Sequence, residues 1–292
     1  MHERRRFIVP LAGGRSLALG ARTLVMGILN VTPDSFSDGG QHADAAHAVD
    51  AGLRMVDEGA DLIDIGGEST RPGALPLDAA EERRRVLPVV EALAARVSVP
   101  ISVDTYKASV ADAALSAGAA LVNDVSGLRY EPALGDVVAR HRAAIVLMHT
   151  RGRSRDMYAQ ANYHDVIDEV RDELRESLAF AVGHGVDRDR IVLDPGLGFA
   201  KHTAHSYETL ARLHELADLG RPLLSGPSRK GFLWKPFTRE LTGVDRDWVT
   251  AAAVTASVLC GAHIVRVHAV REMARVVRIA DEIRKYHRAQ FE

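Results

Sequence analysis

The segment Leu121-Val122-Asn123-Asp124, the helical stretch Ala133 to Arg140 and the run Ala144-Ile145-Val146-Leu147-Met148-His149 decide the fold class. The first and last are short apolar runs that end in polar residues, and the middle one has the apolar spacing of a helix. Near-continuous apolar runs are typical of parallel strands, which are covered on both faces. The segment therefore predicts a strand, a covering helix and a second parallel strand.

The same alternation extends in both directions along the chain. The expected strands are Leu24 to Leu29, Leu62 to Ile65, Ile101 to Val103, Leu121 to Val122, Ala144 to Met148, Ile191 to Leu193, Leu223 to Leu224 and Ile264 to Val267. The expected helices are Ala43 to Glu58, Asp78 to Arg96, Lys107 to Ala117, Ala133 to Arg140, His164 to His184, Ser206 to Leu216, Asp247 to Cys260 and Val270 to Phe291. Eight strands alternating with eight helices predict an α/β fold of the (β/α)8 TIM barrel class.

Two further features bear on the architecture. The segment Phe7 to Leu19, with Ala12-Gly13-Gly14 in its middle, predicts an N-terminal hairpin at the barrel floor. A doubly wound open sheet is the competing architecture, but the first strand is followed by Asn30-Val31-Thr32-Pro33 and not by a glycine-rich dinucleotide fingerprint. Because the sequence contains no linker-like or repetitive tract, we expect one domain over residues 1–292.

The composition excludes several classes of protein. Of 292 residues, 47% are hydrophobic and 26% charged, which is the mixture of an ordinary globular chain. The 37 Lys and Arg nearly balance the 39 Asp and Glu, so nucleic acid is not an expected partner. Cys260 is the only cysteine, which rules out an intrachain disulfide or a cysteine zinc cluster. We expect a cytoplasmic protein, without a signal peptide or a membrane span.

Polar residues lie near the end of every predicted strand or directly after it, where a barrel of this kind builds its active site. They are Asn30, Asp64 with Glu68 to Arg71, Asp104-Thr105, Asn123-Asp124, His149, Asp194, Ser225 to Lys230, and Arg266 with His268. Two long segments, Asn30 to Gly40 and Gly66 to Gly73, are typical of lids over a barrel mouth. Together these residues predict a polar pocket in one mouth of the barrel.

Each of these residues also has a structural interpretation. Asp104, Asn123 and Asp124 could cap helices or form turns. Asp64, between two isoleucines, fits either a buried structural network or a ligand contact. Arg266 shares a strand face with His268 and suits an anion, but it could instead pair with a barrel carboxylate.

A second anion-binding element is expected after the seventh strand. Ser225-Gly226-Pro227-Ser228-Arg229-Lys230-Gly231 combines small residues, two cations and an expected helix start. Its spacing is not that of a Walker A loop, so a nucleoside triphosphatase is not indicated.

Two segments are specific enough to suggest a family. Met26 to Gly40 reads MGILNVTPDSFSDGG, and Asp64 to Gly73 reads DIGGESTRPG. Shorter matches follow in order at Val103-Asp104-Thr105, Asn123 to Gly127, Met148-His149, Leu193 to Phe199, Ser228-Arg229-Lys230 and Arg266-Val267-His268. From about Val25 to about Ala280 the chain closely resembles dihydropteroate synthase, a pterin-binding enzyme family of folate biosynthesis.

The resemblance implies a transferase that condenses 6-hydroxymethyl-7,8-dihydropterin diphosphate with p-aminobenzoate. The products are 7,8-dihydropteroate and pyrophosphate, Mg²⁺ is the expected cofactor, and the family is a sulfonamide target. Mg²⁺ and fixed cations would stabilise the negative charge that develops on the leaving diphosphate. The family is usually dimeric, and apolar segments such as Ala251 to Cys260 fit a homodimer contact.

The resemblance also assigns roles to individual residues. The expected catalytic residues are Asp34, Thr70, Arg71 and Lys230. The expected pterin-binding residues are Asp104, Asn123, Met148, Asp194, Phe199 and Lys230. The expected diphosphate-binding residues are Asn30, Thr70, Arg266 and His268, with Asn30 also the Mg²⁺ ligand. The expected p-aminobenzoate-binding residues are Phe36, Thr70, Pro72 and Ser228, the last next to an expected helix start.

Two alternatives belong to other functional classes. A methyltransferase acting between methyltetrahydrofolate and a corrinoid protein would share the pterin-binding barrel, but would not need the two specific loops or Ser228-Arg229-Lys230. A non-catalytic pterin-binding paralogue would require the loss of a catalytic feature. Pro227, which has no N–H to donate, and Ala269, where the family commonly has Asp, are departures from the family pattern.

Overall fold

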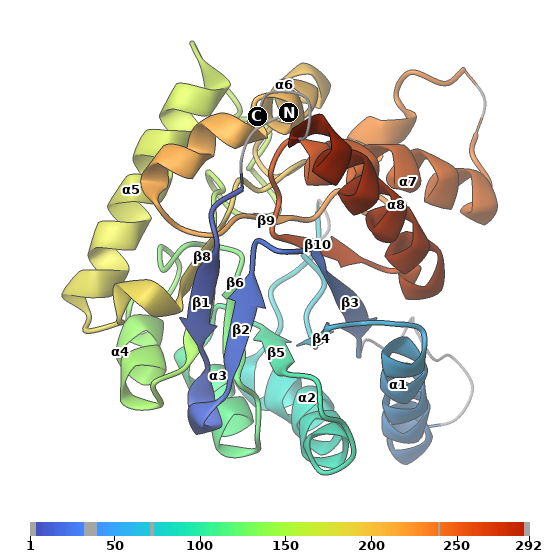
Figure 1. Ribbon diagram of the computed structural model, residues 1–292. Helices are drawn as coiled ribbons and strands as arrows, with labels where there is room; N and C mark the ends of the chain where they lie inside the picture. The colour runs from blue at the N-terminus through green and yellow to red at the C-terminus, as the bar shows by residue number, and fades with distance from the viewer. Residues whose placement is uncertain (1–3, 32–39, 71–72, 239, 289–292) are drawn as a thin grey trace.

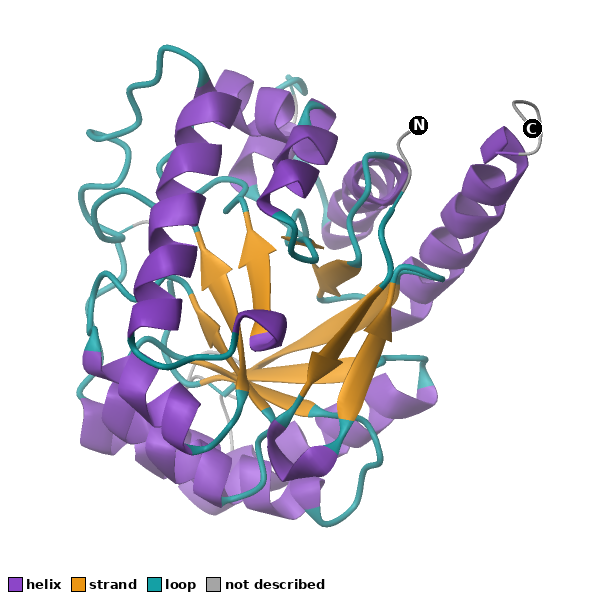
Figure 2. Ribbon diagram, turned by 60° about the vertical axis from the view of Figure 1, so that its left-hand side comes forward, coloured by secondary structure: helices purple, strands orange, loops and turns teal. Residues whose placement is uncertain are grey.

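A computed structural model describes residues 4–31, 40–70, 73–238 and 240–288, of which 40–44 and 287–288 are described by their backbone only. Within these ranges, eight parallel strands form one sheet in the order β8-β7-β6-β5-β4-β3-β10-β9. A parallel bridge between Leu193 and Leu223 joins the two ends of the sheet. The strands occupy the centre and the helices surround them (Figure 2), so the predicted (β/α)8 barrel is confirmed.

The barrel strands lie close to the predicted runs. They are β3 (Leu24–Asn30), β4 (Leu62–Gly66), β5 (Ile101–Asp104), β6 (Leu121–Asp124), β7 (Ala144–Met148), β8 (Ile191–Asp194), β9 (Leu224–Ser225) and β10 (Ile264–Val267). Several strands extend one or two residues beyond the apolar run into the polar residues that follow. These polar side chains are therefore held on strand ends and not on free loops.

The helices alternate with the strands (Figure 1). They are α1 (Gly40–Asp57), α2 (Ala79–Ala94), α3 (Ala108–Ser116), α4 (Ala133–Arg140), α5 (Val166–Gly183), α6 (Thr203–Ala211), α7 (Gly243–Leu259) and α8 (Val270–Arg288). Short 3₁₀ helices lie at η1 (Ala12–Gly14), η3 (Arg188–Arg190), η4 (Leu213–Leu219) and η5 (Gly231–Trp234).

Two predicted helices differ most from those observed. The expected helix over Ser206 to Leu216 is two elements, because α6 ends at Ala211 and the chain continues as 3₁₀ helix from Leu213. The expected helix from Asp247 begins earlier, at Gly243. There Thr242 and Asp245 exchange side-chain and backbone hydrogen bonds as a capping box, a signal that the sequence carries as Thr-x-x-Asp.

Strand alternation divides the apolar residues into two cores. Outward-facing residues such as Ile63, Val103 and Leu147 pack with the helices in the larger core. Inward-facing residues such as Leu62, Leu121 and Ile264 fill the barrel floor.

The N-terminal hairpin closes that floor, as predicted. β1 (Phe7–Pro10) pairs antiparallel with β2 (Ser16–Leu19), and the hairpin lies across one end of the barrel (Figure 1). Its buried residues Val9, Leu11, Leu17 and Leu19 belong to the same cluster as the inward-facing barrel residues. The floor is thus apolar and plugged, which leaves the opposite end for a ligand.

Hydrogen bonds from the buried Arg4 side chain connect the N-terminal segment to the last helix. The Arg4 guanidinium donates to Thr23 Oγ1 (2.6 Å), the Ala262 carbonyl (2.5 Å) and Asp281 Oδ1 (3.2 Å). Asp281 also accepts the Thr23 N–H (2.6 Å). The first residues, the start of β3 and α8 therefore meet in one network.

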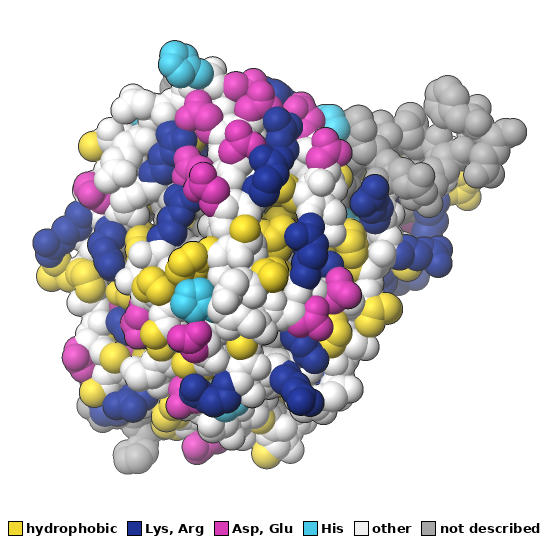
Figure 3. Space-filling view, turned by 90° about the vertical axis from the view of Figure 1, so that its left-hand side faces the viewer, with side chains coloured by type: hydrophobic (Ala, Val, Ile, Leu, Met, Phe, Trp, Pro, Cys, Tyr) yellow, Lys and Arg dark blue, Asp and Glu magenta, His cyan; other side chains and the backbone are white. Residues whose placement is uncertain are grey.

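The surface agrees with the balanced charge of the sequence. On the face that carries α4 and α5, acidic and basic side chains are interspersed (Figure 3), so neither sign forms a large patch there. Among the described helices none is long and apolar enough to cross a membrane.

We expect Arg4→Met to lower the free energy of unfolding by about 3 kcal/mol, because the buried Asp281 carboxylate loses its hydrogen-bonded cation and keeps only the more distant Arg284, at 3.7 Å. Urea unfolding followed by circular dichroism measures the change. Arg22→Met is the matched control: Arg22 pairs with Asp61 at the surface with 60% of its side chain exposed, and its loss should cost about 1 kcal/mol or less. Equal losses for the two variants would contradict the structural role given to Arg4.

Candidate active site

The predicted polar residues lie on the inner face at the carboxyl ends of the strands. Side chains two residues apart share a strand face. Each of the following polar or sulfur-containing residues comes two positions after a residue of the floor cluster: Asp64 after Leu62, Asn123 after Leu121, Met148 after Val146, Asp194 after Val192, and Arg266 after Ile264. The same alternation that builds the apolar floor therefore gathers these side chains in the mouth.

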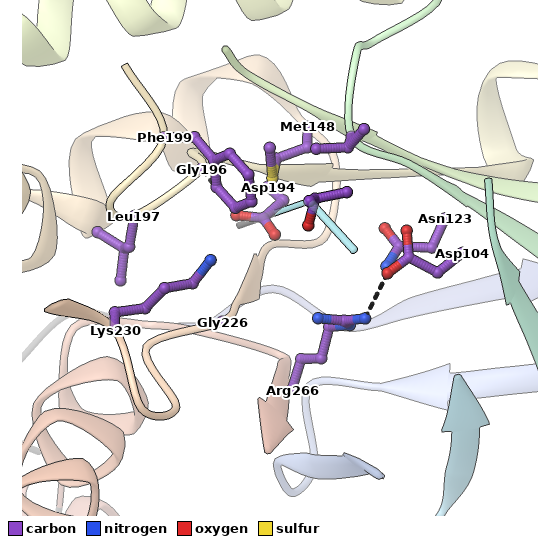
Figure 4. Close-up of a pocket in the computed structure, with 12 residues that line it drawn as sticks. Asp104, Asn123, Met148, Asp194, Gly196, Leu197, Phe199, Gly226, Lys230 and Arg266 are labelled. Carbon is purple, nitrogen blue, oxygen red and sulfur yellow. Dashed lines mark hydrogen bonds and ion pairs between the residues drawn. The ribbon is translucent and has the colours of Figure 1, made fainter. Parts of the chain in front are cut away.

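A pocket opens between these side chains. It is lined by Thr70, Asp104, Asn123, Val125, Met148, Asp194, Gly196, Leu197, Phe199, Gly226, Lys230 and Arg266. Figure 4 shows Asn123, Asp104 and Arg266 on one side of the space and Phe199, Asp194 and Lys230 on the other. All six predicted pterin-binding residues therefore meet at one cavity.

A largely buried ionic network holds one side of the pocket. Arg266 donates from Nε to Asp64 Oδ2 (2.6 Å) and from Nη2 to Asp104 Oδ2 (2.5 Å). Asn123 Nδ2 donates to the same Asp64 oxygen (2.8 Å). The structural alternatives considered for Asp64 and Arg266 are thus observed: Asp64 does not line the pocket but orients two residues that do, and Arg266 pairs with barrel carboxylates.

Burial shifts the ionisation of the groups around the pocket. Burial raises the pKa of Asp104 to about 7, although the charge of Arg266 opposes the shift. Burial also raises the pKa of Asp194, opposed by a hydrogen bond from the Gly196 N–H. On the cationic side, burial and then the nearby Arg266 lower the pKa of Lys230 to about 8. Such shifted groups in a cleft are typical of a ligand site.

One carboxylate oxygen of Asp194 and the ring of Phe199 are fixed by neighbours. Asp194 Oδ1 accepts the Gly196 N–H at 2.8 Å, which shapes the turn after β8. The Lys230 ammonium nitrogen lies 3.8 Å from the centroid of the Phe199 ring. The pocket therefore presents a flat apolar surface next to hydrogen-bonding groups.

The segment after β9 is only partly as predicted. Ser228 is buried and its Oγ lies 2.9 Å from His268 Nδ1 and accepts the His268 backbone N–H at 3.1 Å. Arg229 lies apart from the pocket and pairs with Asp247 on α7. The expected helix start is wrong, because only the short 3₁₀ helix η5 follows and α7 begins at Gly243. A helix dipole is therefore not available beside Ser228.

Thr70 reaches the pocket from a well-anchored segment after β4. Glu68 accepts the Leu77 N–H at 3.0 Å and forms an ion pair with Lys107, which also pairs with Glu82. These contacts hold the chain that leads to Thr70.

The remaining predicted residues have different outcomes. Asn30 ends β3 and shares its inner face with Met26. Asp34, Phe36, Arg71 and Pro72 lie outside the described residues. Asp124 is a turn residue, since it accepts hydrogen bonds from Ser126 and Leu128.

Some residues of the site were not singled out from the sequence. Val125, Gly196, Leu197 and Gly226 line the pocket, although each lies within a motif that was recognised. Gly196 carried a usable signal, because it follows a strand-end aspartate and has a positive φ of 69° that favours glycine.

The described residues can supply only some of the ligands of a Mg²⁺ ion. Within the described ranges, no group of three His, Cys, Asp or Glu side chains is placed to hold a metal ion. Mg²⁺ usually keeps several waters and is held by few protein oxygens together with substrate phosphates. An amide oxygen such as that of Asn30 suits such an arrangement, in which the diphosphate completes the ligands.

Known proteins resemble this chain over almost its whole length. The family model described as pterin binding enzyme matches residues 26–268. The dihydropteroate synthase of Synechocystis sp. is 45% identical over 278 residues, which cover 95% of this chain and 96% of the relative.

Two solved structures of the Xanthomonas albilineans dihydropteroate synthase show the same fold. The one with 4-aminobenzoic acid has a TM-score of 0.86 and 44% identity, and covers 94% of this chain and 98% of its own. The one in complex with 7,8-dihydropteroate has a TM-score of 0.83 and 41% identity, and covers 94% of this chain and 99% of its own. Since the family model spans the barrel and these relatives match nearly end to end, the chain belongs to the dihydropteroate synthase family of pterin-binding enzymes and catalyses that family's transfer reaction.

Proposed function

We propose that the mouth residues divide the synthase reaction among three tasks: recognition of the pterin, retention of the diphosphate and placement of p-aminobenzoate. The observation that carries this division is the arrangement of Asp104, Asn123, Asp194 and Lys230 around one pocket beside Phe199. A pterin is a flat ring with N–H donors and acceptor atoms along one edge. The pocket offers the complementary groups.

Pterin recognition follows from the hydrogen-bonding capacity of these side chains. Asp104 and Asp194 accept from ring N–H groups, while Asn123 can both donate and accept. Lys230 donates to the ring oxygen and nitrogen. Met148 and Phe199 cover the apolar faces of the ring. The complex of the Xanthomonas relative with 7,8-dihydropteroate supports a pterin compound as the ligand.

Retention of the diphosphate falls to Asn30, Thr70, Arg266 and His268. Arg266 is held by two carboxylates, so its positive charge is fixed in place before substrate arrives. Preorganised charge of this kind stabilises a developing anion without reorganisation. Bound Mg²⁺ would supply further charge neutralisation of the diphosphate, with Asn30 as its protein ligand.

The chemical step exchanges one bond for another at the pterin methylene carbon. The carbon–oxygen bond to the diphosphate breaks and its electron pair leaves with pyrophosphate. The amine nitrogen of p-aminobenzoate forms the new bond and loses one proton to water or to pyrophosphate. Since an aromatic amine is a neutral nucleophile, no general base is required, and Lys230 contributes by holding the ring.

Placement of p-aminobenzoate falls to Phe36, Thr70, Pro72 and Ser228, with Asp34 and Arg71 closing over the reacting carbon. Support comes from the 4-aminobenzoic acid structure of the Xanthomonas relative. Exclusion of water at this carbon is the main duty of such a cover, because water would compete with the amine. If the carbon–oxygen bond breaks before the amine attacks, exclusion of water matters more, because water would react with the pterin cation.

We also propose a cytoplasmic homodimer. Cys260 is a free, half-buried thiol, which suits a reducing compartment. The exposed face of α8 carries Ile279, Ile283 and Tyr286 at helical spacing, and Trp248 of the neighbouring α7 is 73% exposed. An apolar surface of this kind fits a second copy of the chain.

The reaction is tested by pyrophosphate release from the purified protein with Mg²⁺ and the dihydropterin diphosphate. We expect release together with a product of the mass of 7,8-dihydropteroate when p-aminobenzoate is present, and a loss of both when EDTA removes Mg²⁺. Release at an unchanged rate without p-aminobenzoate would show that ionisation precedes attack, whereas dependence on both substrates would show direct displacement. A folded protein that binds pterin but forms no product would refute the synthase function.

We expect Asp194→Asn to raise the Kd for 6-hydroxymethylpterin by about tenfold to a hundredfold, because a hydrogen bond to a charged group is worth about 1.5–3 kcal/mol. Isothermal titration calorimetry measures the Kd. Asp61→Asn is the control, since Asp61 lies at the opposite end of the barrel beside Arg22 and should leave the Kd unchanged. An unchanged Kd for Asp194→Asn would remove Asp194 from pterin recognition.

We expect Ile279→Glu with Ile283→Glu to convert the dimer to a monomer, because two buried carboxylates would face the partner's apolar surface. Sedimentation equilibrium gives the mass in solution. Ile8→Glu is the control, as Ile8 is 62% exposed on the floor hairpin. A wild-type protein that sediments as a monomer would contradict the dimer directly.

A further inference from the structure

Lys201 is a buried cation that the proposed mechanism does not use. It follows the turn after β8, only 1% of its surface is exposed, and it is among the largest fully buried side chains of the described residues. Its Nζ lies 2.8 Å from His149 Nδ1, 3.3 Å from the Gly196 carbonyl and 3.2 Å from the Phe199 carbonyl. Three acceptors around one nitrogen match the three N–H donors of an ammonium group.

The imidazole of His149, which accepts a hydrogen bond from Lys201, contacts Glu173 through its other ring nitrogen. His149 Nε2 lies 3.2 Å from a Glu173 carboxylate oxygen without the geometry of a hydrogen bond. Burial, and then the charge of Lys201, lower the pKa of His149 to about 3, so the ring is neutral and can accept at Nδ1. Although burial opposes it, contacts with His149, Arg151 and Arg129 hold the pKa of Glu173 below its usual range.

The carbonyls bound by Lys201 belong to the segment that forms one wall of the pocket. Asp194, Gly196, Leu197 and Phe199 all line it. At Gly196 a Cβ atom would lie 2.0 Å from the His149 carbonyl oxygen, so this turn is pressed against the end of β7. At the other end of the turn, the Lys201 ammonium binds both the Gly196 and the Phe199 carbonyl and so holds them close together.

The backbone after Phe199 is held in an unfavourable conformation. Ala200 has a positive φ of 46°, which L-residues with a side chain rarely adopt. Its carbonyl accepts from the Tyr163 hydroxyl at 2.8 Å. The contacts of Lys201 and Tyr163 therefore maintain a turn that the local sequence does not favour by itself.

We infer that Lys201 is a positioning residue for pterin binding: its ammonium group holds the Gly196 and Phe199 carbonyls so that Asp194 and Phe199 keep the shape of the pocket wall. The inference rests on the proposed pterin recognition. A residue that only filled space here would be better served by an apolar side chain, since burying an ammonium without a carboxylate partner is costly.

The positioning depends on the protonation of Lys201. Burial lowers the pKa of Lys201 to about 7, while the charges of Asp194 and Glu173 oppose the shift and those of Arg151 and Lys230 favour it. Below this pKa the ammonium serves all three acceptors. Above it, a neutral amine has two N–H donors and one contact is lost. Pterin affinity should therefore weaken as pH rises through the pKa of Lys201.

Comparing the Kd of the variant with that of wild type at each pH cancels the effect of other groups that titrate near neutrality. Asp104 and Lys230 both titrate between about 7 and 8 by their pKa values, and they are unchanged in a Lys201 variant. We therefore expect the ratio of the Kd of Lys201→Met for 6-hydroxymethylpterin to that of wild type to be about tenfold or more at pH 6. It should fall severalfold by pH 9 but stay above one, because neutral wild-type Lys201 has lost one contact and keeps two that methionine cannot make.

Calorimetry at pH 6, 7, 8 and 9 measures the ratio, and two further variants guard the interpretation. Lys201→Gln keeps two N–H donors without charge and serves if the methionine variant does not fold. Arg4→Met removes another buried cation, at the barrel floor, and should leave the ratio at one throughout. Hydrogen exchange in wild type needs no variant: amides 196–200 should lose protection above pH 7 relative to those of β6.

The outcomes separate this inference from the proposed function. Wild type that does not bind 6-hydroxymethylpterin would overturn pterin recognition itself. Wild type that binds it, together with a Lys201 ratio that stays at one or that does not change with pH, would overturn the positioning role. A ratio that falls with rising pH, with the Arg4 control at one, supports it.

Discussion

The arrangement of the mouth depends on one largely buried guanidinium. Arg266 from β10 bridges Asp64 on β4 and Asp104 on β5, and Asp64 in turn orients Asn123 on β6. Unpaired charges inside a barrel would be very costly, whereas a paired and hydrogen-bonded set is tolerated. Four strands thus have their polar ends fixed relative to one another before a ligand arrives.

This constraint gives the barrel two unlike ends. The floor is filled by apolar inward-facing residues and sealed by the hairpin, while the same strand faces become polar two residues later. A polar cavity in a packed barrel needs an apolar floor beneath it, because burial of the apolar layers supplies the energy that stabilises the fold. The charges in the mouth are then available for recognition and for stabilising a leaving anion.

The loops around the pocket are held by contacts behind it. Lys201 binds two carbonyls after β8, the Ser228 hydroxyl meets His268 after β9, and Lys107 joins Glu68 to Glu82 after β4. Each contact fixes a loop that carries a residue lining the pocket, namely Phe199, Lys230 and Thr70. A site built on such supports keeps its groups within the narrow limits that positioning requires.

The amino-acid sequence by itself determined the barrel, the floor hairpin and the family, because strand and helix periodicities and the two long motifs are local patterns. It also predicted which residue types gather at the mouth. Only the tertiary structure decided that Asp64 serves Arg266 and Asn123 and that Ser228 meets His268. These depend on which side chains meet across strands distant in the chain, and the role of Lys201 does too, since its partner His149 lies 52 residues away.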